Sequence, residues 1–439
     1  IALYGSPEDN VSVAARLKQT GFTRLSTLSD ALSQTDRLQK LPHFEQLVYP
    51  QWLHDLQQGK AVAAAPAGDW KLFEAAWGAP KLYLLSHIPG AGYIDTNEVE
   101  SEPLWNKVSD AQLKAMLAKH GIRHDTTVIL YGRDVYAAAR VAQIMLYAGV
   151  KDVRLLDGGW QTWSDAGLPV ERGMPPAQQP APDFGAPIPG QPQLMLDTEQ
   201  ARGLLHRQDA SLVSVRSWPE FIGTTSGYSY IKPKGDIAGA RWGHAGSDST
   251  HMEDFHNPDG TMRSADDIAA LWRQWNILPS QQVAFYCGTG WRASETFMYA
   301  RAMGWPHVAV YDGGWYEWSS NPHNPVARGE QSVTRPASAR RPLSATRDTP
   351  FTLWSLPALR SGSHCRCASP SSASTARQTA TPARRNAPET GSRGQTTGWS
   401  PSPPSVPRDS TAIYGRSRDW RSGAWPPGRQ KRESCCRCR

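Results

Sequence analysis

Short apolar runs alternate with longer segments of helical period along residues 1 to 330. The runs "VILY" from Val128 and "VAFY" from Val283 have the length of buried strands, and a segment of about ten helix-forming residues follows each of them. Strands that alternate with helices predict a parallel sheet covered on both faces. In such sheets ligands bind beyond the carboxyl ends of the strands, so the residues after each run are the candidate functional residues.

The same pattern occurs twice at a fixed spacing. Residues 128–163 align with residues 283–318 at a constant offset of 155 without a gap, and both segments contain Asp-Gly-Gly-Trp. Upstream, "HIPGA" from His87 matches "DIAGA" from Asp236 at an offset of 149, so the later copy carries six extra residues near "TTSGYSYIKPKG". Self-similarity of this extent predicts tandem domains built on one supersecondary unit.

The repeat and the composition together predict the domain organisation. Residues 1 to 31 show a strand, helix, strand rhythm that matches the second half of the unit, and the chain starts without Met inside an apparent strand at Ile1. We therefore expect a fragment or processed form in which the first half of that unit and any export signal are missing. The expected segments are a partial domain at 1–46, a domain at 47–173, a Pro-rich linker at 174–192, a domain at 193–330 and a tail at 335–439.

Charge separates the tail from the body of the chain. From Arg335 onward the chain has 19 Lys and Arg against 5 Asp and Glu, whereas the body is mildly acidic. The tail is rich in Arg, Ser, Pro and Gly and has no apolar period, so we expect it to be disordered. An out-of-frame reading of a GC-rich gene would give this composition. Attraction of nucleic acid without sequence preference is the functional alternative.

Other sequence features exclude further classes of function. No window approaches the roughly 18 apolar residues of a membrane span, so we expect no membrane partner. The cysteines at 365–367 and 435–438 lack the spacing of a zinc site. His244, His251 and His256 fall near the extra segment of the later copy and also match no metal signature, so we expect solvated loop histidines and no metal.

The candidate chemistry lies in "FYCGTGWRASE", residues 285 to 295, where Cys287 ends an apolar run. The loop that leads from it into a helical segment consists of Gly288, Thr289, Gly290, Trp291 and Arg292. Two glycines permit positive φ, so that successive amides can point at one spot and form an anion cradle. A helix N-terminus and the Arg292 cation both favour a thiolate. We therefore expect a nucleophilic sulfur whose anionic products the amides stabilise.

A lone cysteine is more commonly a small buried apolar residue, and the repeat discriminates between the two interpretations. The residue aligned with Cys287 is Gly132, in the loop "GRDVYA". A packing role predicts a side chain in both copies. Chemistry confined to one copy predicts a thiol in one and none in the other, as observed.

These residues resemble the rhodanese family of sulfurtransferases. The resemblance is carried by Cys287 at the head of a six-residue loop, "VSVRSWPEF" from Val213, "DIAGA" from Asp236 and "VYDGGWYEW" from Val310. The earlier copy keeps "HIPGA" and "LLDGGW" without the cysteine, as inactive rhodanese domains do. With the partial copy in front, the body resembles the three-domain thiosulfate sulfurtransferases of the enteric bacterial periplasm. This implies tandem rhodanese-like α/β domains and a periplasmic location.

The resemblance implies that the Cys287 thiolate attacks the outer sulfur of thiosulfate, releases sulfite and holds a persulfide. That sulfur would pass to cyanide, a thiol or a protein acceptor, without a metal or an organic cofactor and without a specific nucleic acid. The amides of residues 288–292 would hold the persulfide, and Arg292 would favour the anionic donor. Arg216, Asp312 and Trp315 are implied to support the loop rather than to react.

Thiosulfate is the expected donor from the resemblance of the whole chain, and several departures from the family pattern bear on that choice. The usual "VDVR" has Ser214 in place of the acid, and Glu220 stands where two-domain thiosulfate enzymes place a second cation. The Gly-Thr-Gly interior of the loop is closer to 3-mercaptopyruvate sulfurtransferases. A sulfur relay without turnover is a further alternative. A cysteine phosphatase is disfavoured because Arg292 follows Cys287 by five residues, where phosphatases would require six.

Overall fold

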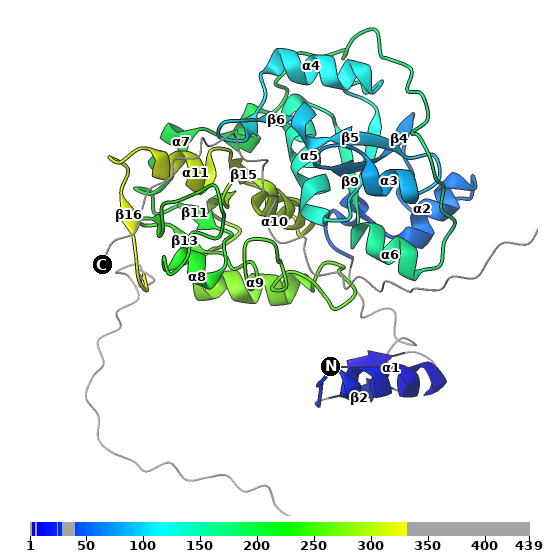
Figure 1. Ribbon diagram of the computed structural model, residues 1–439, viewed down its shortest axis with the longest axis horizontal. Coiled ribbons are helices and arrows are strands. Elements are labelled where there is room, and N and C mark those ends of the chain that lie inside the picture. Colours follow the sequence, from blue (N-terminus) through cyan, green and yellow to red (C-terminus); the bar gives the residue numbers. More distant parts are fainter. Residues whose placement is uncertain (1, 5–6, 24, 29–39, 332–439) are drawn as a thin grey trace, which may run out of the picture. The chain divides into compact units, whose positions relative to one another are not determined.

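The computed structural model describes residues 2–4, 7–23, 25–28 and 40–331 (Figure 1). The expectations for the tail at 335–439, including its cysteines, fall outside the described residues. At the start of the chain, strand β1 (Ala2–Tyr4), helix α1 (Pro7–Gln19) and strand β2 (Ser26–Leu28) follow one another, and β1 pairs with β2 in parallel. This is the strand, helix, strand order that the sequence predicted.

Residues 47–166 form an all-parallel sheet with helices on both faces. The strand order is β3 (Leu47–Val48), β9 (Asp152–Leu156), β8 (Thr127–Tyr131), β4 (Trp70–Ala76) and β5 (Gly92–Asp95). The helices are α2 (Pro50–Gln57), α3 (Lys81–Leu85), α4 (Asp110–Lys119), α5 (Val135–Ala148) and α6 (Gly159–Asp165). We call this region the cysteine-free domain.

Residues 195–327 repeat the arrangement. The strand order is β10 (Met195–Leu196), β15 (Val308–Tyr311), β14 (Gln282–Tyr286), β11 (Ala210–Ser214) and β13 (Arg241–Trp242), again all parallel. The helices are α7 (Thr198–Leu204), α8 (Trp218–Phe221), α9 (Ala265–Gln274), α10 (Trp291–Ala302) and α11 (Gly314–Ser320). We call this region the cysteine domain. The predicted class, tandem α/β domains with parallel sheets covered on both faces, is confirmed.

Short elements complete the two domains. Antiparallel pairs join β6 (Glu100–Ser101) to β7 (Asn106–Lys107) and β12 (Asp236–Ile237) to β16 (Val326–Ala327). Among the described residues, the 3₁₀ turns are η2 (Phe44–Gln46), η3 (Thr96–Glu98) and η4 (Pro192–Leu194).

Residue alternation along the central strands explains why both faces of each sheet are buried. In β14, Val283 and Phe285 belong to the core beneath α9 and α10, whereas Ala284 and Tyr286 belong to the core beneath α7 and α11. Since successive side chains of a strand point to opposite faces, a strand that is apolar at successive positions, as β14 is from Val283 to Tyr286, must be covered on both faces. The strand β8, which is buried along its whole length, is sandwiched in the same way in the cysteine-free domain.

Two of the helices begin where the sequence provides a side-chain acceptor. Ser109 before α4 and Asp197 before α7 each accept a hydrogen bond from the amide three residues on, and Gln112 and Gln200 complete two capping boxes. Helix α5 ends on Gly149 at φ +110°, a backbone conformation that glycine adopts without strain.

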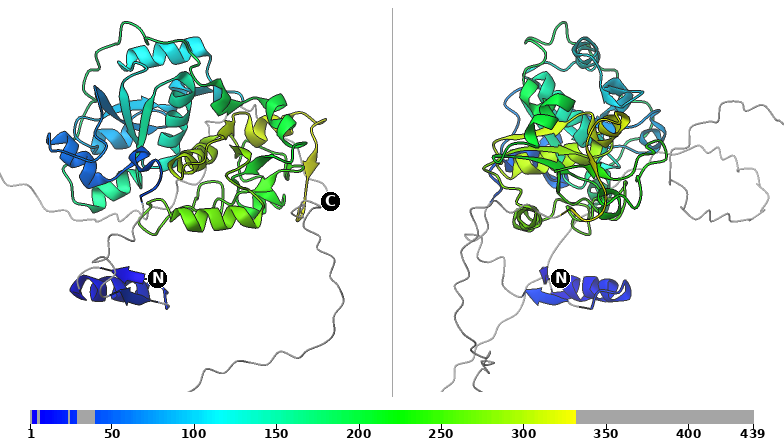
Figure 2. Two further views of the ribbon diagram at one scale, coloured as in Figure 1. Left: turned by 180° about the vertical axis from the view of Figure 1, so that it is seen from behind. Right: turned by 90° about the vertical axis from the view of Figure 1, so that its left-hand side faces the viewer.

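Helices α5 and α10 pack against each other and join the two domains (Figures 1 and 2). Ala138, Ala142 and Met145 of α5 share one continuous apolar cluster with Phe297 and Ala300 of α10. Small residues on both helices permit this close packing. The apolar core on one face of each sheet is therefore continuous with that of the other domain.

The join is pseudo-symmetric in its polar contacts as well. Asp157 of the cysteine-free domain accepts a hydrogen bond from the Met262 amide at 2.8 Å, and Asp312 of the cysteine domain accepts one from the Lys107 amide at 2.9 Å. Asp312 lies 155 residues after Asp157, and Met262 lies 155 residues after Lys107, so the two pairs occupy equivalent positions of the repeat. The Asp-Gly-Gly-Trp repeats thus supply reciprocal links between the domains.

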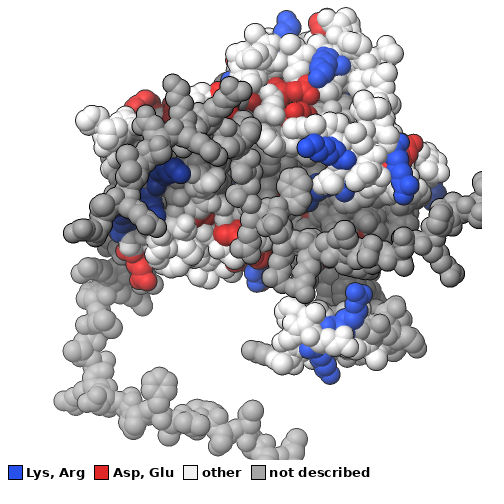
Figure 3. Space-filling view, in the orientation of Figure 1, with Lys and Arg blue, Asp and Glu red and all other residues white. Residues whose placement is uncertain are grey.

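On the face in Figure 3, side chains of Lys and Arg and of Asp and Glu are both visible among the described residues. Within the described part of the chain, no helix combines the length and the apolar composition needed to cross a bilayer.

Candidate active site

Cys287 is the first residue beyond the carboxyl end of β14, and α10 begins four residues later at Trp291. This is the position at which parallel sheets place their ligands. The Cys287 side chain is buried, with 1% of its surface exposed. Its sulfur therefore lies inside the loop rather than on the surface.

The loop turns an amide toward the sulfur. Gly290, the N-cap of α10, has φ +105°, and its N–H donates a hydrogen bond to the Sγ of Cys287 at 3.2 Å. The first amides of a helix have no partner within the helix and carry partial positive charge. The sulfur thus lies at the positive end of α10, as the anion-cradle interpretation requires.

The other side of the loop is anchored by the Asp-Gly-Gly-Trp turn. The Trp315 amide donates to the Cys287 carbonyl at 2.8 Å, and the Tyr316 amide donates to the Gly288 carbonyl at 3.1 Å. A Cβ on Gly314 would lie 2.6 Å from the Gly288 oxygen, so glycine is required for this approach. The structure therefore brings Trp315 to the reactive loop through its main chain.

Arg292 is held by a carboxylate. Its two terminal nitrogens donate to the two carboxylate oxygens of Glu220 at 2.9 and 3.0 Å, and they also donate to the Tyr228 hydroxyl at 2.8 Å and the Asp248 carbonyl at 3.2 Å. Burial alone would raise the pKa of Glu220, but Arg292 and Arg216 outweigh it and lower the pKa to about 2. The Arg292 charge is thus compensated, and its expected role toward an anionic donor stays a prediction.

Arg216 supports the site from beneath. It is fully buried, and its guanidinium contacts the Gly235 carbonyl at 2.7 Å, Asp236 at 3.1 Å and the Trp315 ring at 5.0 Å from the centroid. Ser214 donates to the same Asp236 carboxylate at 2.7 Å. Asp236 therefore provides the acid that the sequence lacks at position 214, which gives a structural account of that departure.

Asp312 acts between the domains rather than at the sulfur. Its carboxylate accepts from Arg140 at 2.7 Å and from the Lys107 amide at 2.9 Å, and both donors belong to the cysteine-free domain. The family resemblance implied that Asp312 is a supporting residue, but its partners Arg140 and Lys107 lie too far away along the chain to be predicted.

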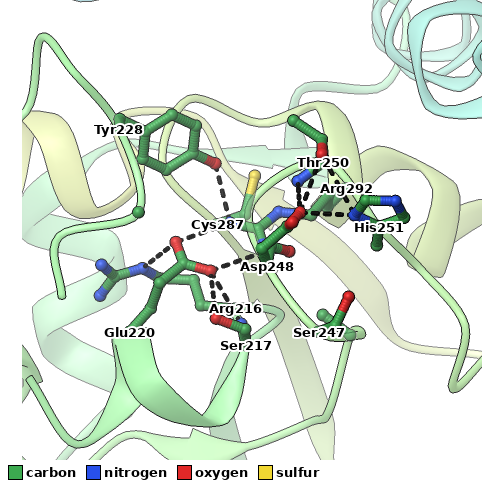
Figure 4. Close-up of polar contacts among 12 residues, drawn as sticks. Arg216, Ser217, Glu220, Tyr228, Ser247, Asp248, Thr250, His251, Cys287 and Arg292 are labelled. Atoms are coloured by element: carbon green, nitrogen blue, oxygen red, sulfur yellow. Dashed lines mark hydrogen bonds and ion pairs between the residues drawn. The ribbon is translucent and has the colours of Figure 1, made fainter. Parts of the chain in front are cut away.

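A cavity of about 280 Å³ adjoins the loop. Tyr228 forms part of its wall, and a Cβ on Gly288 would lie 2.4 Å from the Tyr228 ring, which shows how closely wall and loop approach. Figure 4 shows Tyr228, Asp248 and Arg292 around Cys287. The described residues that line the cavity include no Lys or Arg; they are Ser217, Pro219, Glu220, Thr225, Ser226, Gly227, Tyr228, Ser247, Asp248 and Ser249.

A larger cavity of about 580 Å³ lies in the cysteine-free domain, between α2 and β4, with His54, Trp70 and Lys71 among its lining residues. None of its lining residues belongs to the cysteine loop. The smaller cavity is also lined by residues outside the loop, but Glu220, Tyr228 and Asp248 in its wall hydrogen bond to Arg292 of the loop, which makes it the candidate substrate site.

The expectation of solvated loop histidines is wrong for two of the three. His244 is buried and stacks on Trp242 at a centroid distance of 3.8 Å. His256 is largely buried and hydrogen bonds to Glu295 of α10. His251 is exposed and contacts Asp248 at 2.6 Å. Stacking on Trp242 shields His244 from water and packing against α10 shields His256, and the sequence could show neither contact.

Several site residues were missed from the sequence. Tyr228 lies within "TTSGYSYIKPKG", so the six-residue insertion was the available signal for it. Glu220 was noted only as a departure from the family, although its ion pair with Arg292 organises the site. Asp248 and Arg140 carried no local signal, because their roles depend on contacts between distant segments.

The sequence comparisons agree with this geometry. A family model described as "Rhodanese-like domain" matches residues 50–166 and 197–321. The chain is 84% identical over 331 residues to the thiosulfate sulfurtransferase YnjE of Escherichia coli (strain K12), a match that covers 75% of this chain and 76% of that protein.

Solved structures are also similar. The crystal structure of YnjE has a TM-score of 0.71 and covers 76% of this chain and 80% of its own. A variant of EanB, described as a cysteine persulfide in a tetrahedral intermediate state with ergothioneine, is 40% identical with a TM-score of 0.69, covering 75% of this chain and 83% of its own. An anaerobic ergothioneine biosynthesis enzyme from Chlorobium limicola, in complex with its natural substrate trimethyl histidine, is 39% identical at a TM-score of 0.69 with the same coverage.

The geometry of the loop at residues 287–292, the two similar domains and these matches all indicate the same family. The resemblance stated from the sequence is therefore confirmed: the chain belongs to the rhodanese family, with two rhodanese-like domains, of which the second carries the cysteine.

Proposed function

We propose that the chain is a thiosulfate sulfurtransferase that works through a persulfide on Cys287. The observation that carries the proposal is the hydrogen bond from the Gly290 amide to the Cys287 Sγ at the N-terminus of α10. An amide already directed at sulfur costs no reorganisation when negative charge develops there. The similarity to YnjE supports thiosulfate as the donor.

In the first half-reaction the Cys287 thiolate attacks the outer sulfur of thiosulfate. An S–S bond forms to Cys287, the S–S bond of thiosulfate breaks, and its electron pair leaves with sulfite. In the second half-reaction cyanide or a thiolate attacks the outer sulfur of the persulfide, and the Cys287 thiolate leaves. The sulfur moves at one oxidation level, so neither an external oxidant nor a cofactor is required.

The site offers dipoles and hydroxyls rather than free cations to these substrates. Arg292 and Arg216 are both paired with carboxylates, Glu220 and Asp236 respectively. The loop amides are therefore the main stabilisers that we assign to the persulfide anion. A 3-mercaptopyruvate donor has the same requirement at the sulfur, so the two donors are separated by comparing their kcat/KM values on one preparation.

The test of the proposal is thiosulfate-dependent thiocyanate production by wild type and Cys287→Ser. We expect turnover by wild type and none by the variant. A persulfide that forms on Cys287 without thiocyanate turnover would support the relay alternative with a protein acceptor. Absence of both would contradict the proposal.

A second candidate acceptor is the imidazole carbon of trimethyl histidine, the substrate of the Chlorobium enzyme. Tyr228 precedes Cys287 by the same number of residues as the tyrosine replaced in the EanB variant precedes its persulfide cysteine. Thr289 likewise matches, two residues after the cysteine, a threonine replaced in an EanB structure with hercynine. The cavity beside Tyr228, lined by hydroxyls and carboxylates, suits a trimethylammonium cation.

In that reaction a C–S bond forms at the ring carbon, the S–S bond breaks, and the carbon-bound proton is transferred so that Cys287 regains its thiol. Persulfide-loaded protein is mixed with trimethyl histidine, and the product is sought by mass spectrometry as substrate plus one sulfur. Formation by wild type and its loss in Tyr228→Phe would support this acceptor. Thiocyanate production without that product would reject this acceptor and leave the thiosulfate proposal intact.

We propose a periplasmic location from the family resemblance. The body of the chain holds a single cysteine, which suits an oxidising compartment because surplus thiols form unwanted disulfides there. Fractionation of cells that express the native gene tests this location, and recovery of the protein with cytoplasmic markers would contradict it.

A further inference from the structure

The cysteine-free domain contacts the loop at residues 287–292 through one buried arginine. Arg140 lies on α5, is fully buried, and occupies the repeat position of Glu295 on α10. Its Nε donates to Glu100 at 2.9 Å, and its Nη2 donates to Asp312 at 2.7 Å and to the Trp105 carbonyl at 3.1 Å. It therefore bridges both domains with its own charge balanced by two carboxylates.

The guanidinium of Arg140 lies directly behind Gly290. A Cβ on Gly290 would lie 2.7 Å from Nη1 and 2.9 Å from Cζ of Arg140. Nη1 is buried and has no hydrogen-bond partner among the described residues. The guanidinium thus fills the space behind the residue whose amide donates to the Cys287 sulfur.

Two further contacts fix the loop from the same side. The free carboxylate oxygen of Glu100 accepts from the Trp291 indole N–H at 2.6 Å. Asp312, which Arg140 holds, begins the turn that presents the Trp315 amide to the Cys287 carbonyl at 2.8 Å. Through Glu100, Arg140 is linked to Trp291 at the end of the loop. Through Asp312, it is linked to the turn that binds Cys287 at the start of the loop.

The charge of Arg140 favours the ionised form of Glu100. Burial raises the pKa of Glu100 to about 7, and Arg140 is the main influence that opposes the rise. Without Arg140, two buried carboxylates would lose their counter-ion, and Glu100 would more readily take up a proton.

We infer that Arg140 of the cysteine-free domain is a positioning residue of the active site, which holds the Gly290 amide on the Cys287 sulfur through Glu100, Asp312 and its contact with Gly290. This inference rests on the proposed sulfurtransferase function. It assigns the cysteine-free domain a part in the chemistry, because the loop is complete only when that domain is docked against it.

The test compares Arg140→Met, Arg140→Lys and a matched control, Arg154→Met. Arg154 is also a buried arginine of the cysteine-free domain, but its partners, Asp152 and the Ala64 carbonyl, belong to that domain. Thiocyanate kinetics with thiosulfate give kcat and KM, and alkylation of Cys287 by iodoacetamide gives a readout that does not require turnover.

We expect Arg140→Met to lower kcat at least tenfold with KM for thiosulfate within about threefold, and to change the alkylation rate of Cys287. Arg140→Lys should restore part of kcat, and Arg154→Met should retain the wild-type kcat per folded molecule. Folded Arg140→Met with wild-type kcat and alkylation rate would overturn the inference. Inactive wild type would instead overturn the proposed function, while the alkylation comparison would still test the positioning.

A folding defect is addressed by a second variant. Arg140→Met combined with Glu100→Gln removes the arginine together with one of the buried carboxylates that it balances. We expect this double variant to fold more stably than Arg140→Met and to keep the low kcat. Recovery of wild-type kcat by the double variant would show that Arg140 serves only to neutralise Glu100, and would overturn the inference.

Discussion

The Gly290 amide lies 3.2 Å from the Sγ of Cys287 and donates a hydrogen bond to it. The Cys287 side chain is buried, so this contact lies inside the loop. The contact requires Gly290 to have φ +105°, a conformation that residues with a Cβ rarely adopt. One glycine therefore couples the backbone geometry of the loop to the electrostatics of the sulfur.

Gly290→Ala tests this coupling. The added Cβ would be strained at the positive φ and would lie 2.7 Å from the Arg140 guanidinium, so we expect a loss of at least about 1 kcal/mol in the free energy of unfolding. We also expect at least a tenfold fall in kcat, because the amide must turn away from the sulfur. Chemical denaturation and thiocyanate kinetics measure the two effects.

The matched control is Gly203→Ala in α7, where a Cβ would meet no atom within 4 Å and φ is not positive. Its free energy of unfolding should rise slightly or stay unchanged. Equal behaviour of the two variants would show that Gly290 has no special role.

Glu220 makes the stability of the cysteine domain decrease in acid. Its pKa in the folded chain is about 2, against an ordinary value of 4.5, because Arg292 and Arg216 outweigh the effect of burial. The carboxylate therefore contributes stability above about pH 4.5, and this contribution is lost as the pH falls toward 2. The shift corresponds to about 3 kcal/mol at neutral pH.

Glu220→Gln should accordingly lose about 3 kcal/mol or more of unfolding free energy at pH 7 and much less at pH 3, as measured by urea denaturation. Glu199→Gln, at a carboxylate that is 79% exposed, is the control and should change little at either pH. A loss for Glu220→Gln that is the same at both pH values would contradict the ionised pair with Arg292.

The sequence predicted those features that recur at short range or at the repeat offset. The strand, loop and helix around Cys287 are contiguous, and the aligned Gly132 led us to expect that chemistry is confined to one copy. The alternation of apolar runs and helices was enough for the two parallel sheets, because a strand without polar positions must be covered on both faces.

Contacts between distant segments were not predictable in this way. Glu220 lies 72 residues from Arg292, and Arg140 lies 172 residues from Asp312. Neither partner is specified by periodicity or by local motif, since the pairing arises only when α5 and α10 pack together and when α8 approaches the loop. The expectation for His244 and His256 failed for the same reason.

Asp157, which accepts a hydrogen bond from the Met262 amide across the domain interface, gives the stability a pH dependence of the opposite sign. Burial raises its pKa to about 6, and the Met262 amide only partly opposes this. Its contribution to stability is therefore full at low pH and is lost as the pH rises through 6. The shift corresponds to about 3 kcal/mol at most.

Asp157→Asn keeps a carbonyl oxygen for the Met262 amide and removes the buried charge. We expect its thermal midpoint to exceed that of wild type by a few degrees at pH 8, with the difference closing at pH 4. Asp165→Asn, at an exposed position of α6, should show no such trend. A lower midpoint for Asp157→Asn at pH 8 would mean that the carboxylate has a favourable partner there.

Intact-mass spectrometry after exposure to thiosulfate tests the central claim most directly. The account predicts that the wild-type chain gains the mass of one sulfur atom, that peptide mapping locates it on Cys287, and that cyanide removes it as thiocyanate. Cys287→Ser should gain nothing. A wild-type chain of unchanged mass, or an equal gain in Cys287→Ser, would contradict the account.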